Sequence, residues 1–171
     1  MKPFAVLILL SFLFSSVLVA QSSQSLCPNV LRLLSIETDS SARKPPRVEV
    51  RRCGVDRGEG LQILAWQAGT RAAPILVIDT HGFGVVQTFS RDNIFLIETA
   101  NGARNRVFVI QYESGTPKLV VNQVTKGTAE VAASEKYVVV TITGIWAGDA
   151  PPRTESHTFL LDFRQMERSE K

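Results

Sequence analysis

Short apolar runs separated by turn residues dominate the chain between residues 75 and 143. Each run holds about four to eight mainly β-branched or aromatic residues, and the runs recur about every ten residues. Gly, Asn, Asp or Pro lies in the intervals, as expected for tight turns. This cadence predicts an antiparallel meander of β-strands. The runs cover residues 75–78, 85–89, 94–97, 107–110, 119–121 and 137–140.

Three further segments extend this pattern on both sides. Residues 47–53 and 61–66 precede the runs, and residues 157–163 follow them. In the first of these segments apolar and charged residues alternate, as they do in a strand with one face in water. We predict a single all-β domain over residues 47–163, with about eight to ten antiparallel strands in a sandwich or flattened barrel.

The N-terminus has the pattern of a signal peptide over residues 1–20. Lys2 supplies a positive charge, residues 4–14 are apolar, and Ala20 ends a passable cleavage site. The apolar stretch is short for a membrane span, so we expect a secreted or periplasmic chain that begins near Gln21 and has no membrane span after cleavage. An uncleaved N-terminal anchor is the alternative.

The segment 21–46 is expected to hold one short helix and a linker. Pro28 suits a first helical position, and the apolar residues between it and Glu37 form one face of a helix. Small, charged and proline residues then indicate a connecting loop. At the other end of the chain, residues 164–171 form a charged tail.

The two cysteines, Cys27 and Cys53, are predicted to form a disulfide. Export places them in an oxidising compartment, where pairing is the default. The bridge closes a loop of about 27 residues and should stabilise the fold by roughly 3 to 4 kcal/mol through the lost entropy of the unfolded chain.

Charge and motifs narrow the functional class. The formal charge of +3 falls to about +2 without the signal peptide, which is too mild to indicate a nucleic-acid partner. No phosphate-binding glycine loop, His-Glu-x-x-His motif or Gly-x-Ser-x-Gly elbow is present, so no cofactor or metal is expected. The two histidines, His81 and His157, are interpreted as surface residues, although with Asp79, Asp149 and Glu155 they could assemble a metal site.

One fragment suggests an enzyme. Residues 76–82, LVIDTHG, resemble the apolar-Asp-Thr-Gly signature of retroviral-type and bacterial aspartic proteases, and residues 142–144 resemble the second apolar-Gly element of that family. The resemblance implies that Asp79 is a catalytic carboxylate that shares a proton with a second one. His81 stands where the family has glycine, and the alternative is that Asp79 simply ends a strand before a turn.

Aromatic residues in predicted loops suggest a binding site. Phe83 lies between two glycines beside His81, and Trp146 follows Gly144. Loop aromatics on a β-scaffold often form recognition surfaces. Phe83, Trp146 and His81 are therefore candidate binding residues, with the alternative that each aromatic ring plugs an end of the sandwich.

The runs 94–97 and 107–110 are apolar at every position, whereas a strand with one wet face should alternate. Both faces of these strands must be covered. The cover is either internal, in a closed barrel with long loops, or external, by a protein partner or self-association. The leading hypothesis is thus an exported, non-enzymatic β-domain for binding or protein interaction.

A second hypothesis is an inhibitor of a cell-wall hydrolase. Residues 50–53, 61–66, 125–127 and 137–141 are similar to strands and a turn in the small barrels of periplasmic C-type lysozyme inhibitors. This resemblance implies binding to a lysozyme. That family has a cysteine near the C-terminus, and this chain has none after Cys53.

Overall fold

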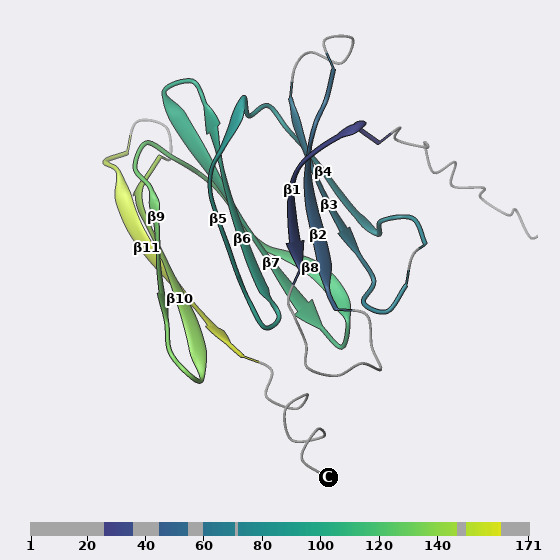
Figure 1. Cartoon of the computed structure of the whole chain (residues 1–171). Helices are drawn as coiled ribbons and strands as arrows, with labels where there is room; N and C mark the ends of the chain where they lie inside the picture. The colour runs from purple at the N-terminus through teal and green to yellow at the C-terminus, as the bar shows by residue number, and fades with distance from the viewer. Residues whose placement is uncertain (1–25, 36–44, 55–59, 71, 147–149, 162–171) are drawn as a thin grey trace, which may run out of the picture.

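The computed structural model describes residues 26–35, 45–54, 60–70, 72–146 and 150–161 (Figure 1). These residues form eleven antiparallel β-strands and no α-helix, which confirms the predicted all-β meander. The predicted signal peptide and charged tail lie outside the described residues. The strands are β1 (Asn29–Ser35), β2 (Arg47–Arg52), β3 (Leu61–Trp66), β4 (Leu76–Thr80), β5 (Gly84–Arg91), β6 (Ile94–Asn101), β7 (Arg104–Glu113), β8 (Thr116–Thr125), β9 (Ala129–Ala133), β10 (Tyr137–Ile145) and β11 (Arg153–Leu160).

The strands are arranged in three layers (Figure 1). β1 to β4 form one sheet in chain order, and β5 to β8 form the middle layer. β9, β10 and β11 form the third layer, which joins the middle layer where Ile145 of β10 pairs with Thr125 of β8. The result is a nearly closed barrel with an additional packed layer.

The middle layer separates two hydrophobic cores because successive side chains of a strand point to opposite faces. In β6, Ile94 and Leu96 pack against β9 to β11, whereas Phe95 and Ile97 pack against the sheet of β1 to β4. β7 divides its buried side chains in the same way. The protein's own outer layers therefore cover both faces of the unbroken apolar runs, and these runs need no external partner.

The predicted N-terminal helix is wrong over the residues that the structure describes, since Asn29–Ser35 is strand β1 and pairs with β2. A β-bulge explains the misleading pattern. The register shifts at Leu31, so Leu31 and Leu34 both pack against the core while Val30 and Leu33 are exposed. The bulge gives a strand the i, i+3 spacing that is typical of a helix.

A disulfide between Cys27 and Cys53, with an S–S distance of 2.02 Å, confirms the predicted pairing. It ties the chain just before β1 to the end of β2.

Among the described residues, no helix is long and apolar enough to cross a membrane.

Candidate binding site

A β-bulge in β10 builds the candidate site. Ile142 still pairs with Ala129 of β9, but the register shifts at Thr143 and Gly144, and Ile145 pairs with Thr125 of β8. Gly144 has a φ of 69°, in the left-handed region that glycine adopts at least cost. The bulge thereby redirects β10 from its own layer to the edge of the middle layer.

The connection from β8 to β9 fixes this bulge in place. The N–H of Lys126 donates to the carbonyl of Gly144 at 3.0 Å. The hydroxyl of Thr125 accepts from the N–H of Gly127 at 2.8 Å and donates to the carbonyl of Thr143. Because these bonds use backbone atoms of both segments, the residues at the end of β10 and after β8 hold a defined relative position.

Trp146 is placed by this arrangement beside two cations. Its backbone N–H donates to the carbonyl of Val124 at 3.4 Å, and the half-buried residue lies where β7 begins and β8 ends. The guanidinium carbon of Arg104 is 3.7 Å from the ring centroid, and the Lys126 ammonium is 4.9 Å from it. Both distances are within the range of cation–π attraction.

Arg106 continues the positive charge along β7. It lies two residues from Arg104, on the same face of the strand. Its Nε donates to Oδ1 of Asn122 at 2.7 Å, and its guanidinium carbon lies 5.4 Å from the ring centroid of Phe108. We refer to Arg104, Arg106, Lys126 and Trp146 together as the cationic corner.

The cations of this corner have no carboxylate partner among the described residues. Elsewhere, Arg47 and Arg51 both pair with the buried carboxylate of Glu49, and Arg153 pairs with Glu155. Exposed ion pairs contribute little to the stability of a protein. Within the described residues, therefore, no carboxylate pairs with the positive charge of the corner.

A buried polar cluster supports the corner from the opposite face of the middle layer. The carboxylate of Glu98 accepts hydrogen bonds from Asn105 Nδ2 at 2.7 Å and from Gln87 Nε2 at 2.5 Å. The same Asn105 amide donates to the carbonyl of Gly127 at 3.3 Å, and the Gln87 amide donates to the carbonyl of Ala129 at 2.5 Å. Since Asn105 and Gly127 adjoin all three of the corner's cations in sequence, the cluster restrains the backbone beneath them.

The predicted loop residues Phe83 and His81 lie at the same end of the middle layer. The N–H of Phe83 donates to the carbonyl of Ala100 at 2.8 Å, close to the β6–β7 turn that leads to Arg104. Phe83 is 62% exposed, so it does not plug the sandwich, and His81 is exposed as well. The structure thus brings Phe83, His81 and Trp146 to one end of the middle layer.

Asp79 lies in β4, on the face of the β1–β4 sheet that points away from the core. Its Oδ1 accepts a hydrogen bond from Gln62 Nε2 at 2.9 Å, and Gln62 Oε1 accepts one from the N–H of Cys27 at 2.9 Å. Arg51 donates to the carbonyl of Cys27 at 3.1 Å. In this setting Asp79 helps to hold the disulfide-bonded segment against the sheet.

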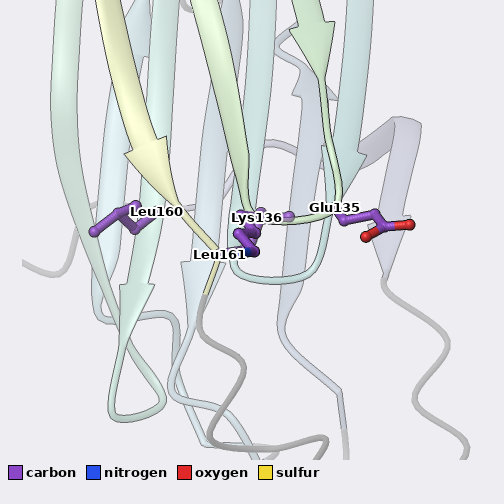
Figure 2. Close-up of a pocket in the computed structure, with 4 residues that line it drawn as sticks. All are labelled: Glu135, Lys136, Leu160 and Leu161. Carbon is purple, nitrogen blue, oxygen red and sulfur yellow. The ribbon is translucent and has the colours of Figure 1, made fainter.

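A surface pocket lies away from these residues. It has a volume of about 400 Å³ and is lined by Glu135, Lys136, Leu160 and Leu161, which Figure 2 shows as sticks. It lies at the opposite end of β10 from the cationic corner. Within the part of the chain that the structure describes, no group of three or more His, Cys, Asp or Glu side chains is arranged to hold a metal ion.

Comparison of the chain with protein-family models, curated proteins and solved structures gave no match, so the site is interpreted from its own geometry. Sequence reasoning found Trp146 but missed Arg104, Arg106 and Lys126. A signal was present, because these cations flank the turn glycines Gly102 and Gly127 without an acidic residue beside them. Their proximity to Trp146 depends on the bulge at Gly144.

Proposed function

We propose that this protein is an exported, non-enzymatic binding domain that recognises an anionic ligand at the cationic corner. The observation that carries the proposal is the position of Arg104 and Lys126, which lie against the ring of Trp146 and have no carboxylate partner among the described residues. Export is inferred from the signal-like N-terminus and agrees with the disulfide.

Preorganisation supports this function. An arginine in solution loses side-chain entropy when it binds an anion, whereas the indole of Trp146 already restrains the guanidinium of Arg104. The flat guanidinium can stack on the ring with its face and still offer N–H groups at its edge to a carboxylate, phosphate or sulfate. Exposed Phe83 at the same end of the layer adds an apolar contact for a larger ligand.

The setting of Asp79 is a further reason to place the function at the corner. Its carboxylate accepts a hydrogen bond from Gln62, which in turn holds Cys27. An aspartic hydrolase would need this carboxylate to share a proton with a second one. The bond to the Gln62 amide supports a structural role for Asp79 at the disulfide.

The experiment measures binding of the mature protein to heparin, a soluble polyanion, by isothermal titration calorimetry. A double variant, Arg104→Gln with Lys126→Gln, should bind at least about tenfold more weakly, because each lost charge removes one contact to the polyanion. The affinity should also fall as salt is raised, more steeply for the native protein than for the double variant. Arg91→Gln is the control, since it removes one partly exposed positive charge from the opposite end of the middle layer.

The control variant should bind heparin within about twofold of the native protein, a difference that is small in free energy. Equal affinities for the native protein and the double variant would show that the corner is not the binding site. Absence of heparin binding together with an absence of binding to small phosphate and carboxylate anions would overturn the proposal as a whole.

A further inference from the structure

β8 has one edge without a strand partner over most of its length. On one side it pairs with β7 along the whole strand, from Thr116 to Thr125. On the other side, the described strand contacts are confined to the end of β8, where Thr125 pairs with Ile145 of β10 and the carbonyl of Val124 accepts from the N–H of Trp146. Thr116, at the start of β8, contacts Gln67. Among the described residues, the backbone N–H and C=O groups that point to this edge between Lys118 and Gln123 have no ladder partner.

The end of β10 already forms the first ladder contacts with this open edge of β8. After the pair of Ile145 and Thr125, the N–H of Trp146 donates to the carbonyl of Val124. In an antiparallel strand the N–H and C=O of one residue point to the same side, and alternate residues share that side. The backbone groups of Asn122 therefore point to the open edge as well, in line with the bond that Trp146 makes.

The charge along this edge is positive. β8 contains Lys118 and no acidic residue, and Lys126 follows it directly. Arg106 reaches across to Asn122 of β8. Lys118 is paired with Glu113 at the far end, so the uncompensated charge is concentrated near the cationic corner.

The spacing of these groups fits an extended polypeptide. Arg104 and Arg106 lie two residues apart on one face of β7, about 6.8 Å along the strand. If a strand added to β8 carries acidic residues at alternate positions, its carboxylates lie on one face and repeat at the same spacing as the two arginines. Val120, which is 40% exposed beside this edge, offers an apolar contact for the residues in between.

We propose that the open edge of β8 takes an extended acidic segment of a partner protein as an added β-strand, with its carboxylates on the cationic corner. This inference rests on the proposed function and names the ligand class of the same site. The backbone groups of the edge distinguish a polypeptide from a polysaccharide or a nucleic acid, because only a polypeptide continues the ladder that Trp146 begins.

The test uses three probes against the mature protein. The first is a peptide of about ten residues with alternating Glu and Val, which is about the length of β8. The second has the same sequence with N-methyl groups on the backbone nitrogens of alternate residues. It keeps the charge but cannot donate backbone hydrogen bonds along one edge. Heparin is the third. The plain peptide should bind at least about tenfold more tightly than the N-methylated one, because several ladder hydrogen bonds are lost.

A variant of the protein provides a second readout. Asn122→Pro removes an N–H that points to the open edge and leaves the ladder to β7 intact. It should weaken binding of the plain peptide at least about tenfold and change heparin binding far less. Asn122→Ala is the matched control, because it removes the contact to Arg106 but retains the N–H. Circular dichroism establishes that both variants are folded.

The outcomes separate the two proposals. Equal affinity for the plain and the N-methylated peptide, with heparin binding that still depends on Arg104, would refute strand addition and leave the anion site standing. Absence of binding by all three probes would overturn both proposals. If Asn122→Pro does not fold, the comparison of the two peptides on the native protein decides the question by itself.

Discussion

A Cβ atom on Gly144 would lie only 2.8 Å from the backbone nitrogen of Gly127, and Gly144 also has a positive φ of 69°. Gly144→Ala should therefore destabilise the protein by about 2 to 4 kcal/mol, because it adds a backbone clash to the cost of a left-handed conformation. Gly102→Ala is the matched control. Gly102 has a φ of 62° but open space around it, so the cost should be only about 1 kcal/mol. Urea unfolding followed by tryptophan fluorescence measures both values.

The same variants test whether the bulge builds the site. Gly144→Ala should also weaken heparin binding, because it displaces Trp146 from Arg104, whereas Gly102→Ala should weaken it less. Equal losses of stability in the two variants would show that the close approach of Gly144 and Gly127 contributes nothing.

Removal of the buried carboxylate should be costly. Glu98→Ala leaves the amides of Gln87 and Asn105 without their shared acceptor and opens space in the middle layer. We expect a loss of about 3 kcal/mol in the free energy of unfolding. Glu130→Ala, which removes an exposed carboxylate from β9, should change stability by less than about 0.5 kcal/mol. A small effect of Glu98→Ala would mean that the cluster does not restrain the corner.

The disulfide should contribute about 3 to 4 kcal/mol, since Cys27 and Cys53 are 26 residues apart in sequence. The double variant Cys27→Ser with Cys53→Ser should unfold at a correspondingly lower urea concentration. Native protein treated with a reductant should behave like the variant, and reductant should have no effect on the variant itself. An unchanged urea midpoint in the double variant would contradict this expectation.

Because the hydroxyl of Tyr112 is buried, we expect the protein to lose stability at alkaline pH. This burial raises the pKa of the hydroxyl from 10.0 to about 12, and the hydroxyl donates to the carbonyls of Arg47 and Trp66. The unfolded state then releases the proton at a lower pH than the folded state, so stability should be retained below pH 10 and fall as the pH rises from 10.0 to about 12.

Absorbance of tyrosinate provides the measurement, because the chain has only two tyrosines. Tyr112 should ionise only well above pH 10.0 or on unfolding. Tyr112→Phe should reduce the loss of stability in base, whereas Tyr137→Phe should leave it unchanged. Ionisation of Tyr112 near pH 10.0 in the folded protein would contradict the burial argument.

Local sequence patterns predicted most of the strands but not the first one. The runs at 94–97 and 107–110 form the centres of β6 and β7, as their β-branched and aromatic residues indicate. β1 was predicted as a helix because a bulge at Leu31 gives Val30, Leu31, Leu33 and Leu34 a helical spacing. Pairing with β2 overrides that local pattern, and pairing is a contact between segments that sequence periodicity does not report.

The sequence left two alternatives for what covers the apolar runs: an internal layer of the protein or an external partner. The third layer decided between them, and that layer exists because the bulge at Gly144 and the connection through Gly127 turn β9 and β10 back over the middle sheet. The apolar runs therefore carry no information about a partner.

The sequence by itself determined the strand class, the disulfide and the presence of aromatic residues in loops, because these depend on residue type and short-range spacing. Only the tertiary structure decided that Trp146 meets Arg104 and Lys126, since these residues come from three segments that hydrogen bonds of Gly144, Val124 and Glu98 bring together. A site built from such long-range backbone contacts has no local signature, because the energy that forms it is distributed over pairings between distant parts of the chain.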